Sequence, residues 1–328
     1  MIATDSNFQI ITPLKPETIV PYLNDGLLNF DVINIESISL IDPMDIKAYW
    51  TSINYSFTIK EMNKFPNIKY VITPTTGLTH IDTREASKRN IKIISLGGED
   101  DFLKNITASS EHAWGLVLGV WRKSFISNAL KEFRPDKREI FMSEQIAGKN
   151  IGLIGYGRIG KRLHQYATAF DMQTFIFDPY IEKNQIQNLP SNTFYLQNLS
   201  EIAKYCDIIV ICASVKSNSY EHYPIINSLF ISKLKKTAVV INIARGILVD
   251  ELALLKAVKS GNIKGVGLDV LQEEDLIDSS KITKQIFKAK NEGFNIVVTP
   301  HIAGMCSDAL DKCMKFVAAK FLKEIINV

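Results

Sequence analysis

The sequence predicts an α/β protein built from two domains, each with a doubly wound parallel sheet. Three observations support this prediction. Short apolar runs alternate with helical patterns along most of the chain, which is typical of strands joined by crossover helices. The 328 residues are enough for two domains. In the second half, an apolar run leads into a glycine-rich turn and then into a helical pattern.

The first hundred residues carry four predicted strands, at Phe8–Thr12, Phe30–Asn34, residues 68–73 and residues 91–95. A helix is expected at residues 16–22, where a proline suits the first turn. Another is expected at Thr83–Lys88, for which Asp82 is a suitable N-cap. Because this half has no glycine fingerprint, we interpret it as a partner domain and not as a second nucleotide site.

The segment between the two halves contains a loop, a helix and a linker. Residues 96–105 form a predicted loop whose acidic cluster, residues 99–101, is first interpreted as solvated surface. Residues 109–121 are predicted to be helical, because apolar side chains recur at positions i, i+3, i+4 and i+7 from Trp114. Residues 131–144 are charged and irregular, which indicates a linker or arm.

The most informative stretch is the turn at residues 155–160. Gly155, Gly157 and Gly160 form the pattern G-x-G-x-x-G between a predicted strand at residues 151–154 and a helical pattern. A second apolar run ends in Asp178, eighteen positions after Gly160. This combination is typical of a dinucleotide-binding βαβ unit.

Each part of this unit has an expected role. Gly155 permits the tight turn, Gly157 lets the backbone approach a pyrophosphate at the helix N-terminus, and Gly160 lets helix and strand pack closely. The Asp178 carboxylate can accept hydrogen bonds from a ribose and would repel a 2′-phosphate. The sequence therefore predicts NAD as the cofactor rather than NADP.

Further strands are predicted at residues 207–212, 238–242 and 266–270 and at Ile296–Val298, with a helix at residues 251–260. With the two strands of the βαβ unit they make six, the number in a doubly wound dinucleotide-binding domain. The C-terminal run Ser307–Ile326 is predicted to be helical. Residues 183–196 are mostly polar and predict no definite element.

Composition and charge argue against several classes of protein. The chain is 46% apolar and 22% charged, as in ordinary globular proteins, and its net charge of +3 gives no electrostatic case for a nucleic acid or a membrane surface. No apolar run approaches the roughly 20 residues of a membrane span, and the N-terminal residues lack the features of a signal peptide. The four cysteines form no C-x-x-C, so we expect reduced thiols in a cytoplasmic protein, with no disulfide and no metal site.

Four more motifs, in order along the chain, resemble signatures of the D-isomer-specific 2-hydroxyacid dehydrogenase family, which includes D-3-phosphoglycerate dehydrogenase. Residues 105–112 (NITASSEH) resemble N-x-x-x-V-A-E-H, and residues 242–250 (NIARGILVD) resemble N-x-x-R-G-x-x-V-D. Residues 267–274 (GLDVLQEE) resemble the L-D-V-F-x-x-E segment, and residues 298–304 (VTPHIAG) resemble T-P-H-I-A-G. The resemblance extends from about Ile68 to Gly304.

The resemblance implies two Rossmann-like or flavodoxin-like domains with a cleft between them. It implies a substrate (catalytic) domain of residues 1–105 plus 299–328 and an NAD-binding Rossmann domain of residues 106–298. The implied activity is the NAD-dependent interconversion of a D-2-hydroxy acid and a 2-oxo acid. A homodimer built on the NAD-binding domains is also implied.

The resemblance further implies that Arg245, Glu274 and His301 are the catalytic residues. An imidazole exchanges protons near neutral pH, so His301 is expected to be the acid in reduction and the base in oxidation. A carboxylate such as Glu274 stabilises the imidazolium. Arg245 can bind the substrate carboxylate through two parallel N–H groups and polarise the ketone. Glu273 is the alternative to Glu274, because the proline that usually follows the catalytic glutamate is absent.

The other expected site residues bind the cofactor or the substrate. The turn of Thr76, Gly77 and Leu78 matches the family loop whose backbone N–H groups hold the substrate carboxylate. The remaining histidines (His80, His112, His164 and His222) are interpreted as structural or exposed. The cofactor site is expected to comprise Gly155, Tyr156, Gly157, Arg158, Ile159, Gly160, Asp178, Ala213, Ala244 and Asp269.

Two departures from the family pattern stand out. Cys212-Ala213-Ser214 replaces His-x-Pro, so the proline that shapes the adenine side of the cleft is absent. Residues 96–105 are longer and more acidic than the corresponding family segment, which suggests selection of a bulky or cationic substrate over a phosphorylated one. An alternative function is an NAD-binding, corepressor-like module with little turnover. Formate dehydrogenase is a poorer alternative, because its histidine follows glutamine whereas His301 follows Pro300.

Overall fold

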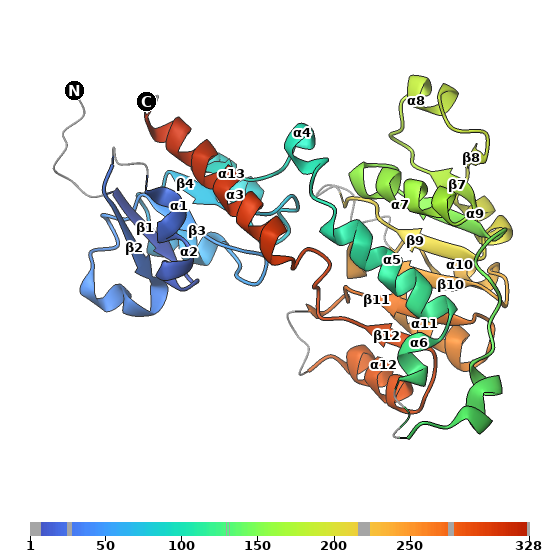
Figure 1. Ribbon diagram of the computed structural model, residues 1–328. Helices are drawn as coiled ribbons and strands as arrows, with labels where there is room; N and C mark the ends of the chain where they lie inside the picture. Colours follow the sequence, from blue (N-terminus) through green and yellow to red (C-terminus); the bar gives the residue numbers. More distant parts are fainter. Residues whose placement is uncertain are drawn as a thin grey trace. The chain divides into compact units, whose positions relative to one another are not determined.

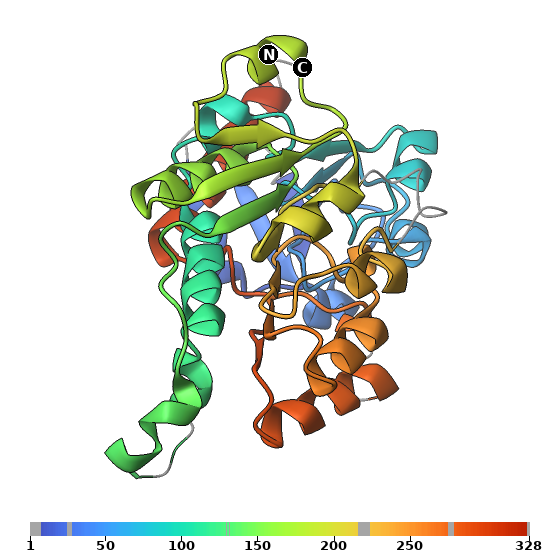
Figure 2. The same cartoon turned by 90° about the vertical axis from the view of Figure 1, so that its right-hand side faces the viewer.

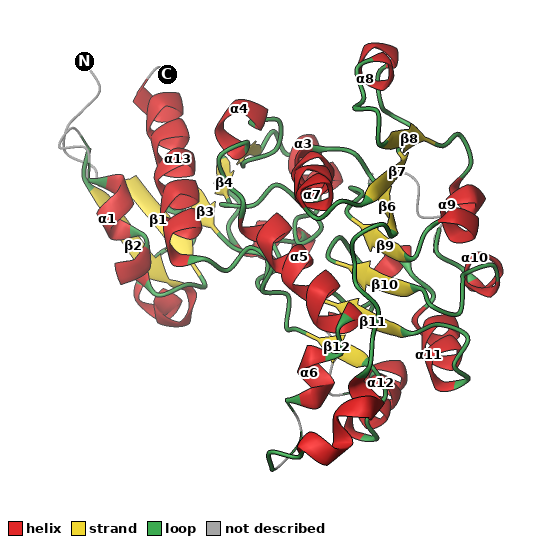
Figure 3. Ribbon diagram, turned by 45° about the vertical axis from the view of Figure 1, so that its right-hand side comes forward, coloured by secondary structure: helices red, strands yellow, loops and turns green. Residues whose placement is uncertain are grey.

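The computed structural model describes residues 8–24, 28–128, 130, 132–215, 224–274 and 279–326 (Figures 1 and 3). The chain divides into two compact units, Met1–Asn105 with Cys306–Val328, and Ile106–Met305. The second unit thus continues to Met305, whereas the sequence placed the return to the first domain at Thr299. The reason is local, because Thr299, Ile302 and Ala303 all donate hydrogen bonds to the Asp269 carboxylate in the second unit.

The first unit is built on a five-stranded parallel sheet with the flavodoxin-like strand order β2-β1-β3-β4-β5. Its strands are β1 (Phe8–Thr12), β2 (Phe30–Asn34), β3 (Ala48–Trp50), β4 (Tyr70–Ile72) and β5 (Lys92–Ile94). The sequence missed β3, because three fully buried residues show no alternation of apolar and polar side chains. The helix predicted at residues 16–22 is a 3₁₀ turn, η1 (Pro16–Thr18), followed by the short helix α1 (Val20–Leu23).

Helices cover both faces of this first sheet. Phe321 of α13 (Ser307–Ile326) packs against Phe8 and Tyr70 on one face. Met62 of α2 (Ile59–Lys64) and Ala86 of α3 (Thr83–Lys88) belong to the core on the other face. Asp82 caps α3 as predicted, since its side chain accepts a hydrogen bond from the amide of Glu85. The 3₁₀ segment η2 (Ile35–Leu40) follows β2.

The predicted acidic loop contains a short helix, α4 (Asp100–Leu103). Phe102 of α4 stacks on Phe316 of α13 with ring centroids 4.1 Å apart. Glu99 forms an ion pair of 2.5 Å with Lys320, so its charge is neutralised within the first unit. Asp100 and Asp101 are exposed, as expected for a solvated surface, and Glu99 is partly exposed.

The second unit is built on a seven-stranded parallel sheet with the order β12-β11-β10-β9-β6-β7-β8. Counted from β6, this is the doubly wound Rossmann order with one further strand at the end. The prediction of six strands missed β8, a three-residue edge strand in the polar stretch 183–196. The strands are β6 (Asn150–Ile154), β7 (Gln173–Phe177), β8 (Thr193–Tyr195), β9 (Ile208–Ile211), β10 (Val239–Asn242), β11 (Gly265–Leu268) and β12 (Ile296–Val298).

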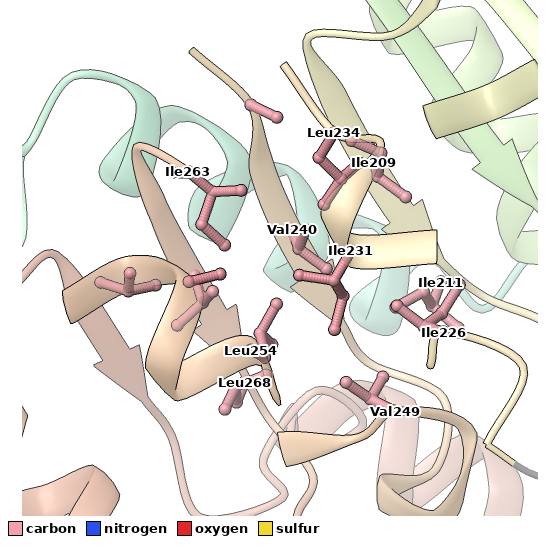
Figure 4. Close-up of a cluster of buried hydrophobic side chains, with 14 of the residues drawn as sticks. Ile209, Ile211, Ile226, Ile231, Leu234, Val240, Val249, Leu254, Ile263 and Leu268 are labelled. Atoms are coloured by element: carbon pink, nitrogen blue, oxygen red, sulfur yellow. The ribbon is translucent and has the colours of Figure 1, made fainter. Parts of the chain in front are cut away.

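Two helical layers enclose the second sheet (Figure 2). One layer contains α5 (Ala108–Trp121) and α7 (Arg158–Ala169). The other contains α9 (Leu199–Tyr205), α10 (Ser228–Ser232), α11 (Glu251–Lys259) and α12 (Lys281–Asn291). Figure 4 shows the apolar core between the sheet and this second helical layer. The strand residues Ile209 and Val240 belong to this core together with Ile231 of α10 and Leu254 of α11. Neighbouring strand residues point to the opposite face, as expected for a sheet that is buried on both sides.

The short elements of the second unit are α6 (Ser124–Ser127), η3 (Pro135–Phe141), α8 (Lys183–Gln187) and η5 (Gly246–Leu248). The predicted linker at residues 131–144 therefore contains the 3₁₀ segment η3. Within the described residues, no helix combines the length and the apolar character needed to cross a membrane.

Candidate active site

The predicted catalytic residues follow three neighbouring strands of the second sheet. Arg245 follows β10, Glu274 follows β11 and His301 follows β12. Since the sheet is parallel, all three strands end at the same edge, where ligands bind in open α/β sheets.

A short turn after β10 positions Arg245. The Asn242 side chain accepts a hydrogen bond from the amide of Ala244 at 3.1 Å and donates one to the carbonyl of Arg245 at 3.0 Å. These two bonds fix the backbone from Ala244 to Arg245. Gly246 comes next, and a Cβ there would lie 2.0 Å from the carbonyl carbon of Leu271. The arginine turn therefore packs directly against the segment that carries Glu274.

The Arg245 guanidinium is largely withdrawn from water. Burial lowers the pKa of Arg245, and the negative charge of Glu274 acts in the opposite direction. One N–H, at Nη1, donates to the carbonyl oxygen of Ala244 at 2.6 Å. A guanidinium has five N–H donors, so others remain for a substrate carboxylate or ketone.

Glu274 and His301 form a hydrogen-bonded pair. His301 Nδ1 lies 2.8 Å from Glu274 Oε2, and because an ionised carboxylate can only accept, Nδ1–H is the donor. Glu274 Oε1 accepts the amide of Leu271 at 2.9 Å, so both carboxylate oxygens are oriented. This leaves Nε2 of His301 as the ring nitrogen for proton transfer. Of the two glutamates that the sequence offers, Glu274 is the one whose carboxylate bonds the imidazole.

Asp269 supports the segment that carries His301. His301 has the left-handed backbone angle φ of 54°, which is costly for a residue with a side chain. Its amide donates to the carbonyl of Asp269 at 2.9 Å. The Asp269 carboxylate accepts the amides of Ile302 and Ala303, each at 2.9 Å, and the hydroxyl of Thr299 at 2.6 Å. Asp269 was predicted to face the nicotinamide, and in the structure it anchors the histidine segment.

His112 joins the same network, although it was interpreted as structural or exposed. Its Nε2 lies 3.1 Å from Thr299 Oγ1 and 3.3 Å from Asp269 Oδ1. Burial alone would raise the pKa of Asp269, but hydrogen bonds from His112, Thr299 and the two amides lower it below its usual value. The sequence signal for His112 was its place in the NITASSEH motif, but its partner Thr299 lies 187 positions away along the chain.

The glycine turn after β6 fits a diphosphate. Gly155 has a φ of 99°, and a Cβ there would lie 2.7 Å from the backbone of Ala213. A Cβ on Gly160 would lie 2.4 Å from the carbonyl oxygen of Gly155. By contrast, a Cβ on Gly157 would meet no atom within 4 Å, so space is open at the start of α7. Gly157 is the N-cap of α7 and has no side chain to bond the first helical amides, which leaves them for an anion.

Asp178 lies at the end of β7, where a ribose is expected. Its Oδ2 accepts the amide of Tyr156 at 2.8 Å, and its Oδ1 accepts the amide of Tyr180 at 2.9 Å. Each oxygen retains a lone pair for a ribose hydroxyl. Cys212, which replaces the family histidine, donates its thiol to the carbonyl of Gly155 at 3.1 Å and thereby ties β9 to the glycine turn. Burial raises the pKa of Cys212 to about 12, so it remains a thiol.

The remaining predicted residues have the following surroundings. Arg158 donates to the carbonyl of Ile106 at 2.8 Å, Ile159 packs against the core at α7, and Ala244 is buried beside Arg245. Thr76, Gly77 and Leu78 belong to the first unit, in a turn closed by a bond of 2.8 Å from the Thr75 hydroxyl to the carbonyl of Gly77.

The other histidines and the cysteines lie away from this network or outside the described residues. His80 bonds Thr73 in the first unit at 3.2 Å, and His222 lies outside the described residues. The cysteines Cys206, Cys212, Cys306 and Cys313 are free thiols, of which Cys212 bonds the glycine turn. Within the described ranges, no three metal-ligating side chains gather around one point.

The chain is similar to proteins of one known family. Residues 114–303 match the family model of the D-isomer specific 2-hydroxyacid dehydrogenase, NAD binding domain. The chain is 32% identical over 267 residues to a glyoxylate reductase of Thermofilum pendens, covering 80% of this chain and 73% of that protein. It is 26% identical over 311 residues to a D-3-phosphoglycerate dehydrogenase of Bacillus subtilis, covering 93% of this chain but only 55% of that longer protein.

A solved structure gives the same fold. D-lactate dehydrogenase of Aquifex aeolicus, crystallised with NAD and lactic acid, superposes with a TM-score of 0.77 at 21% identity and covers 97% of this chain and 95% of its own. At this identity the likeness concerns the fold.

Proposed function

The chain belongs to the D-isomer-specific 2-hydroxyacid dehydrogenase family, and we propose that it interconverts a D-2-hydroxy acid and the corresponding 2-oxo acid with NAD as cofactor. The observation that carries this proposal is the His301–Glu274 pair, with Arg245 beside it, at the sheet edge where the glycine turn also lies. The relatives reported above are named as dehydrogenases and reductases, and none of these names supports the corepressor-like alternative.

A nicotinamide held at the glycine turn would supply the hydride for reduction of the carbonyl carbon and would take up the hydride in oxidation. Arg245 binds the substrate carboxylate and polarises the ketone. His301 donates the proton on Nε2 to the carbonyl oxygen, and Glu274 stabilises the imidazole throughout through Nδ1. In the oxidative direction His301 takes the proton from the hydroxyl group.

The cofactor is expected to be held by the residues around the glycine turn. The open space at Gly157 and the amides that begin α7 suit the diphosphate, and Asp178 suits the ribose of NAD. The negative charge of Asp178 disfavours the 2′-phosphate of NADP. We assign the NAD-binding domain to the second unit, which contains the family match, and the substrate domain to the first.

We assign the substrate carboxylate a second contact, the backbone of Thr76, Gly77 and Leu78. The support for this is the resemblance, together with the ordered turn that Thr75 closes in the first unit. Because the family acts on 2-hydroxy acids, we propose that the substrate is a small 2-hydroxy or 2-oxo acid.

Steady-state kinetics test the proposed function. Oxidation of NADH would be followed by absorbance with a panel of 2-oxo acids, and reduction of NAD with paired D- and L-2-hydroxy acids. The proposal predicts turnover of at least one 2-oxo acid, selectivity for the D isomer and preference for NADH over NADPH. Binding of NADH without turnover of any member of the panel would contradict it and would favour a binding module.

The assembly we propose is a homodimer formed through residues 125–142 of the second unit. Among the described residues of this segment, apolar side chains are exposed, with Phe133 at 94%, Met142 at 71% and Ile140 at 61%. Burying such side chains against a second copy would stabilise a dimer, and the resemblance implies a dimer of the NAD-binding domains. Sedimentation velocity should show a dimer for the wild type and a monomer for Phe133→Asp. Leu229→Asp, on the exposed surface of α10, is the matched control and should remain dimeric.

We also propose a cytoplasmic location. The support is that all four cysteines are free, which suits a reducing compartment. Fractionation of cells that produce the protein tests this, and recovery with membranes or in the medium would contradict it.

A further inference from the structure

His164 lies at the centre of a buried chain of hydrogen bonds that the proposed reaction does not use. It belongs to α7, the helix that starts at the glycine turn, and is only 5% exposed. Its Nδ1 lies 2.6 Å from the hydroxyl oxygen of Tyr156, and its Nε2 lies 2.8 Å from Oγ1 of Thr193 in β8. Both ring nitrogens are thus bonded to residues of other elements.

A neutral imidazole carries one N–H, so one of its two hydroxyl neighbours donates to the ring and the other accepts from it. The Thr193 hydroxyl also lies 3.4 Å from Oδ1 of Asn192. Burial lowers the pKa of His164 and raises the pKa of Tyr156, which favours the neutral form of both side chains. In either tautomer the ring holds both hydroxyl groups.

Tyr156 connects the chain of hydrogen bonds to the glycine turn. It lies between Gly155 and Gly157, and its backbone amide donates to Asp178 Oδ2 at 2.8 Å. One residue therefore bonds α7 through its side chain and the ribose-binding carboxylate through its main chain. At the other end of the hydrogen-bond chain, Thr193 pairs with Thr174 of β7, the strand that leads to Asp178. The hydrogen-bond chain is therefore connected to Asp178 through β7 as well as through Tyr156.

We propose that His164 is a positioning residue for NAD, which holds the Tyr156 side chain and thereby fixes the glycine turn and Asp178 in the arrangement that binds the dinucleotide. The inference rests on the proposed function, because it takes this turn to be the NAD site. Removing the imidazole leaves the buried phenol of Tyr156 without its hydrogen-bond partner, and the turn then gains freedom that NAD binding must remove. Arg245, Glu274 and His301 follow other strands and are unaffected.

Calorimetric titration of the purified full chain with NADH tests this inference. His164→Leu keeps most of the side-chain volume and removes both hydrogen bonds, whereas His164→Gln offers an acceptor and a donor on one amide. Tyr156→Phe removes only the bond to Nδ1. The matched control is Tyr166→Phe, which removes a phenol from the same helix but outside the chain of hydrogen bonds.

We expect NADH to bind about tenfold more weakly to His164→Leu and to Tyr156→Phe. The double variant should show little further loss, because both changes break the same chain. His164→Gln and Tyr166→Phe should stay within about twofold of the wild type. In kinetics, His164→Leu should raise KM for NADH while kcat at saturating NADH is retained, a split that general loss of structure does not produce.

Unchanged NADH affinity in both His164→Leu and Tyr156→Phe would overturn the inference, as would an equal loss in Tyr166→Phe. If His164→Leu does not fold, Tyr156→Phe decides, since it removes a single oxygen. The two proposals fail differently. A wild-type protein that does not bind NADH removes the proposed function as well, whereas equal binding by wild type and variants removes only the role of His164.

Discussion

Replacing Glu251 by glutamine should abolish a loss of stability that the wild type undergoes as the pH rises from 5 to 8. Glu251, the first residue of α11, is 3% exposed. Its Oε1 accepts the amide of Gln272 at 2.6 Å, but Oε2 has no hydrogen-bond partner in the described part of the chain. Burial is the main cause that raises the pKa of Glu251 from 4.5 to about 7. The hydrogen bond from the Gln272 amide lowers this pKa, and the negative charges of Glu273, Glu274 and Asp250 raise it further.

The sign and size of the effect follow from the two pKa values of Glu251. Between pH 4.5 and about 7 the folded chain holds a proton that the unfolded chain has lost. The favourable contribution is therefore complete below pH 4.5 and is lost as the pH rises through about 7. Integration from pH 5 to pH 8 gives a loss of about 2.5 kcal/mol for the wild type. Glu251→Gln does not titrate and should escape this loss.

Urea unfolding of the wild type and Glu251→Gln at pH 5 and pH 8 measures the effect. The difference in free energy of unfolding between the two proteins should shift by about 2.5 kcal/mol in favour of the variant at pH 8. Glu292→Gln, at an exposed site after α12, is the control and should follow the wild type. If the difference in free energy of unfolding between the two proteins changes by less than about 0.5 kcal/mol from pH 5 to pH 8, the reasoning is refuted, because an ordinary surface substitution has an effect of that size.

Three further predictions concern the candidate site. Gly155→Ala combines a φ of 99° with a contact of 2.7 Å to Ala213, so a thermal-unfolding scan should show destabilisation of at least about 2 kcal/mol and calorimetry should show no NADH binding. Asp178→Ala should lower the ratio of NADH to NADPH affinity by at least about tenfold, because the charge that repels a 2′-phosphate is gone; an unchanged ratio would contradict this role. Glu274→Gln can still accept the Leu271 amide but cannot balance an imidazolium, so kcat should fall by about 100-fold with NADH affinity retained. A kcat within about threefold of the wild type would remove Glu274 from the mechanism.

Local patterns predicted most of the elements that build the second unit. The run from the strand before Gly155 to Asp178 specifies a βαβ unit within thirty residues, and the structure has β6, α7 and β7 there. The strands missed, β3 and β8, have three residues each, too few to show a period. Their positions depend on pairing with β1, β4 and β7, which no local pattern reports.

The site was predictable in its residue types but not in its supporting contacts. The motifs predicted Arg245, Glu274 and His301 after the ends of strands, and in the structure it is Glu274 that bonds His301. The roles of His112 and His164 could not be predicted, because a histidine in a helical pattern looks the same whether or not its ring is bonded. Their partners come from elements distant in the sequence.

The most direct test of the central claim is single-turnover hydride transfer in the wild type and His301→Gln. NADH would be bound first, and its absorbance followed after mixing with the best 2-oxo acid from the panel. The account predicts that His301→Gln binds NADH like the wild type but transfers hydride at least about 100-fold more slowly, because the proton donor to the carbonyl oxygen is missing. Transfer within about tenfold of the wild-type rate would show that His301 is not the acid, and the proposed mechanism would then be wrong.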